Sequence, residues 1–192
     1  MRFERFFAFI DLSGFTRFTE VHGDEAAVAV LSDFRSVVRE VASDHGVRVA
    51  KWLGDGAMFV ATDAAAVITT VLEIEERTAA AGTTLPLRAG IAGGPVILFD
   101  GDDYIGGPVN LAARLCDAAD PYEVLAADDL AVHVPGWAVA QVVAPRDLLG
   151  FVTPVPAVRI TVSTRQRRAL GIPLTERKVP GGLADGDTST GT

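Results

Sequence analysis

The sequence has very little of the chemistry that builds disulfides or zinc sites. Among its 192 residues are one cysteine, Cys116, and three histidines. A single cysteine cannot form an intramolecular disulfide, and with so few partners a structural zinc site is not expected. Chains without disulfides are typical of a reducing compartment, so we predict a cytoplasmic protein. Cys116 and the histidines are interpreted as packing or surface residues.

The chain also lacks an excess of positive charge and a long apolar segment. Its 17 lysines and arginines against 25 acidic residues give a net charge of -8. This balance argues against a broad nucleic-acid or anionic-membrane surface. The apolar run near the N-terminus, residues 6–12, is too short to span a membrane, is interrupted at Asp11, and lacks a signal-peptide layout. We therefore predict no nucleic-acid partner, no membrane anchor and no export.

What the chain does have is enough apolar sequence for one core. With 192 residues, of which 49% are hydrophobic, it is long enough for one domain and short for two. After Ser163 and Thr164 the composition becomes basic and then rich in Gly, Asp and Thr. We therefore predict one domain over residues 1–163 and a flexible tail over residues 164–192.

The pattern of apolar residues predicts an α+β fold with a ferredoxin-like core. A run rich in aromatic and apolar residues predicts a mostly buried strand, and helical spacing after Asp24 predicts an amphipathic helix. Asp-Gly between two apolar runs predicts a hairpin, and Asp63 can cap a second helix. The expected βαββαβ core comprises strand 5–12, helix 24–45, strands 47–53 and 57–61, helix 63–81 and strand 85–99. The C-terminal additions are an acidic loop at 100–103, a helix opened by Pro108, and strands at 124–126, 138–143 and 157–162.

Two acidic residues stand where an apolar strand meets a glycine turn. Asp11 ends the first predicted strand, and Asp55 lies between Gly54 and Gly56 in the predicted hairpin. Each alone is more often a turn former than a ligand. Together they suit two carboxylates that hold metal ions over the phosphates of a nucleotide.

Four further residues each have a usual structural interpretation and a functional one. Lys51 beside a turn is usually a solvated strand end, and Asp103 lies in an acidic loop. Asn110 and Arg114 stand four apart on a predicted helix face, where a surface pair is the usual meaning. Only the order in which these residues occur with the two aspartates favours a shared site.

Four segments, in this order, resemble the catalytic domain of the class III nucleotidyl cyclases, the adenylyl and guanylyl cyclase family. They are Phe-Ile-Asp-Leu-Ser-Gly-Phe-Thr (9–16), Lys-Trp-Leu-Gly-Asp-Gly (51–56), Arg-Ala-Gly-Ile-Ala-Gly-Gly-Pro-Val (88–96), and Asp-Tyr-Ile-Gly (103–106) running into Val-Asn-Leu-Ala-Ala-Arg (109–114). The resemblance spans about residues 6–125.

The resemblance implies an adenylyl cyclase that forms 3′,5′-cyclic AMP and pyrophosphate from ATP. It implies that Asp11 and Asp55 bind two Mg²⁺ or Mn²⁺ ions, with the carbonyl of Leu12 as a further ligand. One ion would activate the ribose 3′-hydroxyl and the other would hold the triphosphate. Small residues and backbone N–H groups at the helix start, in Gly14, Phe15 and Thr16, would bind the phosphates.

The same resemblance implies which residues recognise the base and which stabilise the transition state. Lys51 would donate to adenine N1 and Asp103 would accept from its exocyclic amine, a pattern that guanine does not offer. Asn110 would orient the ribose, and Arg114 would face the charge that builds on the α-phosphate. In the family the metal residues and the base-reading residues act from opposite protomers. The resemblance therefore implies a head-to-tail homodimer with two equivalent sites and an inactive monomer.

One departure from the family pattern affects the phosphate site. Where the family has a Leu-Lys-Gly-Phe-like segment, this chain has Leu-Leu-Gly-Phe, with Leu149 in the position of a triphosphate-binding lysine. ATP affinity is then expected to be low unless Arg146 or another cation substitutes. An alternative function follows: a degenerate cyclase-like module that binds nucleotide or a partner without turnover. Diguanylate cyclases share the core, but the chain lacks their Gly-Gly-Asp/Glu-Glu-Phe signature.

Overall fold

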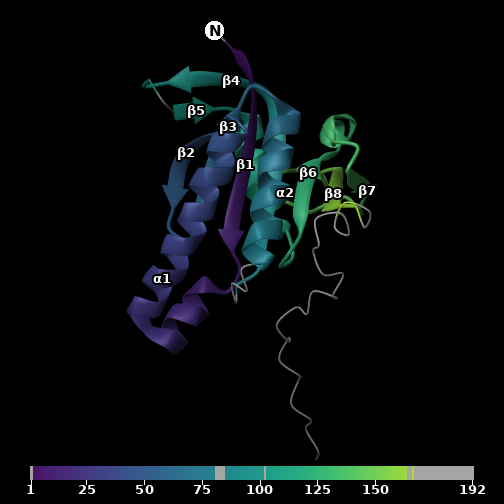
Figure 1. Ribbon diagram of the computed structural model, residues 1–192. Coiled ribbons are helices and arrows are strands. Elements are labelled where there is room, and N and C mark those ends of the chain that lie inside the picture. Colours follow the sequence, from purple (N-terminus) through teal and green to yellow (C-terminus); the bar gives the residue numbers. More distant parts are fainter. Residues whose placement is uncertain (1, 81–84, 102, 164–165, 167–192) are drawn as a thin grey trace, which may run out of the picture.

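A computed structural model describes residues 2–80, 85–101, 103–163 and 166, and these are built around one sheet. The strand order in the sheet is β2-β3-β1-β4-β6-β8-β7, and β5 pairs with β4 (Figure 1). The elements are β1 (Phe3–Leu12), α1 (Phe15–Asp44), β2 (Arg48–Leu53), β3 (Gly56–Ala61), α2 (Ala64–Ala80), β4 (Leu87–Phe99), β5 (Asp103–Ile105), α3 (Gly107–Ala118), β6 (Val124–Ala127), the 3-10 helix η1 (Asp128–His133), β7 (Ala138–Val142) and β8 (Ala157–Val162).

The first six elements form the expected ferredoxin-like core. Their order is strand, helix, strand, strand, helix, strand, and β1 lies between β3 and β4, antiparallel to both. The hairpin of β2 and β3 completes the four-stranded unit. The α+β class and the βαββαβ order predicted from the sequence are therefore confirmed.

Helices cover both faces of the sheet, which explains why β1 does not alternate in polarity. Ala8 and Ile10 pack in a core with residues of α1 and α2, whereas Phe7 packs in a second core with residues of α3. Figure 1 shows α1 and α2 side by side in front of β1. A strand covered on both faces reads as a continuous apolar run rather than as an amphipathic one.

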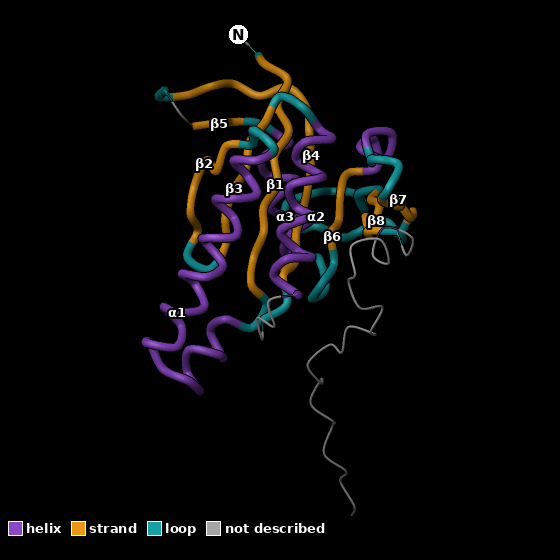
Figure 2. The backbone as a smooth tube through the Cα atoms, in the orientation of Figure 1, coloured by secondary structure: helices purple, strands orange, loops and turns teal. Residues whose placement is uncertain are grey.

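The first helix begins earlier than predicted. The sequence predicted a helix over residues 24–45, but α1 starts at Phe15 and is broken at Gly23, whose φ of 82° and ψ of 172° are not helical. The bend is visible near the start of α1 in Figure 2. The apolar spacing after Asp24 described the second segment only, because the first is short and half-exposed. The second predicted helix is confirmed, and Asp63 Oδ1 accepts a hydrogen bond of 2.9 Å from the N–H of Ala65 at its start.

The prediction of an acidic loop at residues 100–103 is partly wrong, because Asp103 lies in a strand. Residues 103–105 form β5, which pairs with Ile97, Leu98 and Phe99 of β4 in an antiparallel hairpin. Strand pairing uses backbone groups, so an acidic side chain that faces solvent does not prevent it. The strand was too short to recognise from its pattern.

Helix α3 packs directly on the backbone of β4. A Cβ atom on Gly90 would lie 2.1 Å from the nitrogen of Cys116 and 2.2 Å from the carbonyl oxygen of Ala112. Only glycine leaves room for this approach. The packing fixes α3, which carries Asn110 and Arg114, against the sheet that carries Asp11, Lys51 and Asp103.

The C-terminal strands follow the prediction closely. The structure places β6, β7 and β8 at Val124–Ala127, Ala138–Val142 and Ala157–Val162. Glu123, which is 4% exposed, accepts hydrogen bonds from Arg159 Nε at 2.6 Å and from Arg146 Nη2 at 3.2 Å. This ion-pair cluster fastens β8 and the segment before it to the start of β6. The tail predicted at residues 164–192 lies outside the described residues, apart from Gln166.

Candidate active site

Asp11 and Asp55 come together at one end of the sheet. Asp11 is the next-to-last residue of β1 and lies opposite Gly56 of β3, so the turn that holds Asp55 is beside it. Burial and then the charge of Asp11 raise the pKa of Asp55, while a hydrogen bond to its own backbone and the charge of Arg88 lower it. The net direction is upward, because the two carboxylates repel and water is partly excluded.

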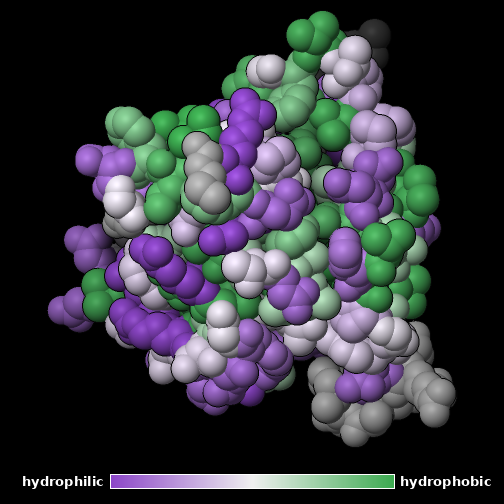
Figure 3. All heavy atoms as spheres, turned by 90° about the horizontal axis from the view of Figure 1, so that it is seen from above, coloured by the Kyte–Doolittle hydropathy of each residue, from purple (hydrophilic) through white to green (hydrophobic). Residues whose placement is uncertain are grey.

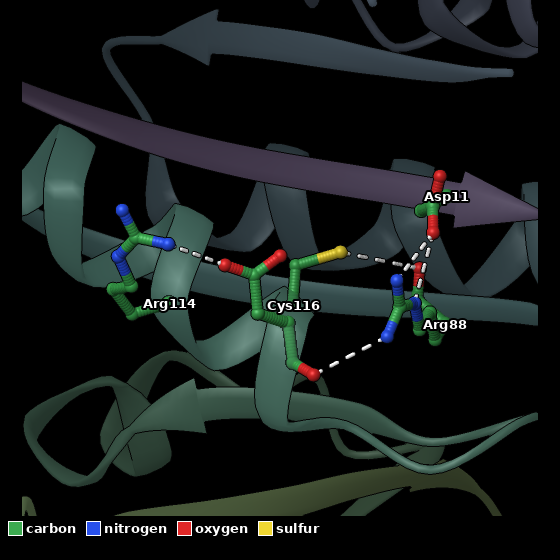
Figure 4. Close-up of polar contacts among 5 residues, drawn as sticks. Asp11, Arg88, Arg114 and Cys116 are labelled. Atoms are coloured by element: carbon green, nitrogen blue, oxygen red, sulfur yellow. Dashed lines mark hydrogen bonds and ion pairs between the residues drawn. The ribbon is translucent and has the colours of Figure 1, made fainter. Parts of the chain in front are cut away.

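Arg88 joins this pair, although no role was predicted for it from the sequence. It lies opposite Asp11 on β4, and its Nη2 and Nε donate to Asp11 Oδ2 at 2.7 and 2.9 Å. Its Nη1 donates to the carbonyl of Asp117 at 3.2 Å (Figure 4). Burial opposes the charged form, but Asp11 outweighs it and raises the pKa of Arg88. The sequence contained no signal for this contact, because it depends on the register of β1 against β4.

The donor set at this end of the sheet fits a divalent cation. The charge of Asp11 raises the pKa of the neighbouring Asp55, and added positive charge would relieve this repulsion. Carboxylate and carbonyl oxygens are the ligands that Mg²⁺ and Mn²⁺ prefer. Across the described residues, no cluster of three or more His, Cys, Asp or Glu side chains could hold a metal ion. Any ion held by this pair would therefore take its other ligands from the backbone, such as the carbonyl of the buried Leu12, from water or from substrate.

The loop after Asp11 presents the start of α1 to the same region. Gly14 precedes the helix with a φ of 84°, a conformation that suits glycine. Within the described residues no side chain caps this helix start and no acidic residue occupies its first turn. Ser13 is held by a hydrogen bond of 2.8 Å from its N–H to the carbonyl of Pro86. The N–H groups of Phe15 and Thr16 thus belong to a helix start without side-chain caps, which is suited to an anion.

Lys51 and Asp103, 52 positions apart in the sequence, are in direct contact. Lys51 Nζ of β2 forms an ion pair with Asp103 Oδ1 of β5. Their side chains are 46% and 49% exposed, so a ligand can reach both. The structure brings these two predicted base-reading residues together.

Asn110 and Arg114 lie on the outward side of α3. The helix buries Ala112, Leu115 and Cys116, which leaves Asn110 exposed and the Arg114 side chain 41% exposed. Arg114 Nη1 donates to Asp117 Oδ2 at 2.7 Å. Figure 4 shows Arg114 apart from the pair of Asp11 and Arg88, with Cys116 between them. The structure therefore does not bring Arg114 to the carboxylate pair of its own chain.

Cys116 is a packing residue of α3. It is 5% exposed, and its Sγ lies 3.7 Å from the carbonyl oxygen of Arg88. Burial raises the pKa of its thiol to about 12, so the thiol is protonated at neutral pH. A protonated thiol is a poor nucleophile, which agrees with the packing role expected from the sequence.

The segment that departs from the family pattern presents no cation from position 149. Leu149 is 79% exposed, whereas its neighbour Leu148 is 6% exposed and packs in the core with α3. Arg146, the suggested substitute, donates to the buried Glu123 at 3.2 and 3.4 Å. Its guanidinium is thus held by a structural ion pair in this chain.

Comparison with curated sequences relates the chain to bacterial proteins. No protein-family model matches it. An uncharacterized protein of Mycobacterium tuberculosis H37Rv is 36% identical over 161 residues, which are 84% of this chain and 42% of the relative. A pH-sensitive adenylate cyclase of M. tuberculosis CDC 1551 is 35% identical over 123 residues, 64% of this chain and 30% of the relative. The chain thus spans less than half the length of these relatives.

Solved structures match over nearly the whole fold. The adenylyl cyclase CyaB from P. aeruginosa superposes with a TM-score of 0.72 and 26% identity, covering 86% of this chain and 97% of that one. The guanylate cyclase domain of RhGC from Catenaria anguillulae, solved with GTP, gives a TM-score of 0.74 and 20% identity, covering 84% and 98%.

The fold is therefore that of a cyclase catalytic domain. The chain resembles class III nucleotidyl cyclase catalytic domains in its sequence and in its fold, and relatives named adenylate cyclase are among its matches. The resemblance found in the four sequence segments is confirmed. In the described part of the chain, no helix is long and apolar enough to cross a membrane.

Proposed function

We propose that this domain is an adenylyl cyclase that converts ATP to 3′,5′-cyclic AMP and pyrophosphate at a site shared by two copies of the chain. The observation that carries the proposal is the convergence of Asp11 and Asp55, two mutually repelling carboxylates, beside the uncapped start of α1. Carboxylates next to an anion-binding helix start are what a metal-bound triphosphate requires.

Asp11, Asp55 and the Leu12 carbonyl would hold two Mg²⁺ or Mn²⁺ ions. When bound, these ions supply Lewis acidity to the ribose 3′-hydroxyl and positive charge to the triphosphate. Arg88 already lies against Asp11, so it would share the same carboxylate with the ions. The N–H groups of Gly14, Phe15 and Thr16 would bind phosphate oxygens.

The reaction then balances as an in-line displacement at the α-phosphate. The bond from the 3′-oxygen to the α-phosphorus forms, the bond from the α-phosphorus to the bridging oxygen breaks, and the 3′-hydroxyl loses its proton to solvent. Pyrophosphate leaves with the bridging oxygen. Asn110 would orient the ribose, and Arg114 would face the charge that develops on the α-phosphate, a contact worth about 2 to 4 kcal/mol of barrier.

The proposed base specificity rests on the contact of Lys51 with Asp103. An ammonium donor beside a carboxylate acceptor matches the acceptor and donor that adenine presents at N1 and its exocyclic amine. Guanine presents the reverse pattern, so the same pair would meet donor with donor. In the free chain the two side chains satisfy each other, and adenine would enter between them.

A homodimer is proposed because one chain separates the residues that one reaction needs. Arg114 lies away from Asp11 of its own chain (Figure 4). The hairpin of β4 and β5, which carries Asp103, also exposes four large apolar side chains, Ile97, Leu98, Phe99 and Ile105. Figure 3 views the molecule from above and shows hydrophobic side chains at the surface among hydrophilic ones. A second copy would cover the apolar hairpin and supply the missing half of each site.

The test is product formation by the purified protein. Incubation with ATP, and separately with GTP, in Mn²⁺ and in Mg²⁺ should yield cyclic AMP and pyrophosphate from ATP, measured by mass spectrometry. An Asp55→Ala preparation made in parallel controls for contaminating cyclases and should form no product. Cyclic GMP as the main product would reject the base assignment.

A second candidate function is favoured by the segment around Leu149. With an exposed leucine in the lysine position and Arg146 bound to Glu123, the triphosphate loses one expected cation. A module that binds nucleotide or a partner without turnover would fit this loss. It would show saturable binding of ATP with Mn²⁺ by a folded dimer and no cyclic product in either metal.

A further inference from the structure

The turn that carries Asp55 is held from outside by a side chain of α1. Arg35 Nη2 donates a hydrogen bond of 3.0 Å to the carbonyl oxygen of Gly54. Leu53 pairs with Gly56 across the hairpin, so Gly54 and Asp55 are its two turn residues. Gly54 directly precedes Asp55, the candidate metal ligand. The hydrogen bond therefore supports this turn from Arg35 of α1, 19 positions earlier in the sequence.

The same guanidinium lies over an aromatic ring of the hairpin. The central carbon of the Arg35 guanidinium is 4.9 Å from the centre of the Trp52 ring, and that of Arg39 is 5.2 Å from the same ring. Trp52 lies on β2, one residue before Leu53 and two before the turn. Arg35 thus contacts the hairpin at two points: it stacks on the Trp52 ring of β2 and donates a hydrogen bond to the turn.

These contacts assign Arg35 a geometric role. Among the described residues it forms no ion pair, and its hydrogen bond goes to a main-chain carbonyl. The turn needs such support, because it carries the Asp55 carboxylate beside that of Asp11, which lies opposite Gly56 on β1. Repulsion between the two carboxylates would otherwise displace the two-residue turn, because Asp11 lies in a strand that is paired on both sides.

We propose that Arg35 is a positioning residue of the metal site, which fixes the Asp55 carboxylate relative to Asp11 through the Gly54 carbonyl and the Trp52 ring. The proposal rests on the proposed function, since it requires that Asp55 bind a metal ion. Arg35 touches no reacting atom in this arrangement. Its loss should therefore weaken metal binding through misplacement of a ligand, by about tenfold or more, as is usual for residues that orient metal ligands.

The test measures Mn²⁺ binding in the full chain without turnover. Free Mn²⁺ is titrated by electron paramagnetic resonance in the presence of 3′-deoxy-ATP, which lacks the hydroxyl that attacks. Arg35→Gln should raise the Mn²⁺ dissociation constant about tenfold, while urea unfolding shows a folded protein. Arg39→Gln is the matched control, because it removes the second cation from the Trp52 ring and leaves the Gly54 bond intact; it should bind Mn²⁺ as the parent does.

Arg35→Lys separates geometry from charge. Lysine keeps the positive charge but lacks the planar fork that stacks and donates at once, so it should bind Mn²⁺ as weakly as Arg35→Gln. Parent-like binding by either Arg35 variant would overturn the proposal. Asp55→Ala separates failure of the proposed metal site from failure of the proposed role of Arg35. If Asp55→Ala leaves Mn²⁺ binding unchanged, the metal role of Asp55 is wrong. If it abolishes Mn²⁺ binding while Arg35→Gln binds as the parent does, only the role of Arg35 is wrong.

Discussion

Replacing Asp55 by Asn should stabilise the metal-free protein and remove its response to metal. Burial and the charge of Asp11 raise the pKa of Asp55 above 3.8 in the folded state. A carboxyl whose pKa is raised by folding destabilises the fold when it ionises, so its cost is absent at low pH and grows as the pH rises through and above its unfolded pKa. The neutral amide removes that cost while it keeps the size of the side chain.

The magnitude follows from the exposure of the site. Asp55 is partly open to water, so solvent screens the repulsion and the gain at pH 7 should be about 0.5 kcal/mol. Metal acts in the other direction on the parent protein, since Mn²⁺ at about one hundred times its dissociation constant adds about 2.7 kcal/mol of stability. For a chain of this size, about 2 to 4 °C of unfolding midpoint correspond to each kcal/mol, so the parent should gain roughly 5 to 11 °C.

Calorimetric unfolding at pH 8 with and without Mn²⁺, and at about pH 3.5 without Mn²⁺, checks both effects. Asp55→Asn should unfold slightly above the metal-free parent at pH 8, with a smaller difference at about pH 3.5, where the carboxyl is largely protonated, and should show almost no Mn²⁺ shift. Asp63→Asn is a matched control, because asparagine can replace aspartate as the cap of α2 and lies outside the site. A lower midpoint for metal-free Asp55→Asn, or a full Mn²⁺ shift in it, would refute the reasoning.

Three further outcomes are expected. Glu123→Ala should lower stability by about 3 kcal/mol in urea unfolding, because it leaves Arg146 and Arg159 without their buried partner; a loss below about 0.5 kcal/mol would show that the cluster is not structural. Leu149→Lys should lower the KM for ATP with no change in unfolding midpoint, since the position is 79% exposed, and an unchanged KM would place the segment away from the phosphates. Lys51→Glu should reduce ATP turnover, whereas equal ATP turnover would remove that residue from base reading.

Mixing two inactive chains tests the shared site. Asp11→Ala and Arg114→Ala each damage a different half of the proposed site, so each should form little product alone. In a mixed dimer, one of the two sites combines an intact metal half with an intact Arg114 half. Activity should therefore return on mixing, toward half of the parent activity per mixed dimer. Absence of any recovery, with mixed dimers demonstrated by mass, would contradict the proposed assembly.

The fold was largely predictable because local patterns and the global topology agree. The hairpin before Gly56, the cap at Asp63 and the βαββαβ order each have short-range signals that the structure confirms. The errors fall where short-range signals are weak. The first segment of α1 is short and half-exposed, and β5 has three residues whose pairing is decided by the backbone of β4.

The candidate site was only partly predictable, because its residues meet through strand register. The motifs indicated Asp11 and Asp55, and the structure places them at one end of the sheet. The contacts of Arg88 with Asp11, and of Arg35 with Gly54, join elements whose relative positions no local pattern specifies. Residues that support a site through tertiary contacts can thus be identified only from the three-dimensional structure.

The break at Gly23 has a mechanical consequence for how the two halves of the pocket communicate. The segment before it begins at the loop that we propose to bind phosphate, and the segment after it carries Arg35 against the turn that we propose to bind metal. A continuous helix would transmit a rotation at one end to the other, but the non-helical residue interrupts the hydrogen-bonded ladder between them. If the proposed roles hold, the phosphate loop could adjust to a ligand without moving the Asp55 turn through α1, and β1, which pairs with β3, would remain as the direct link between the two.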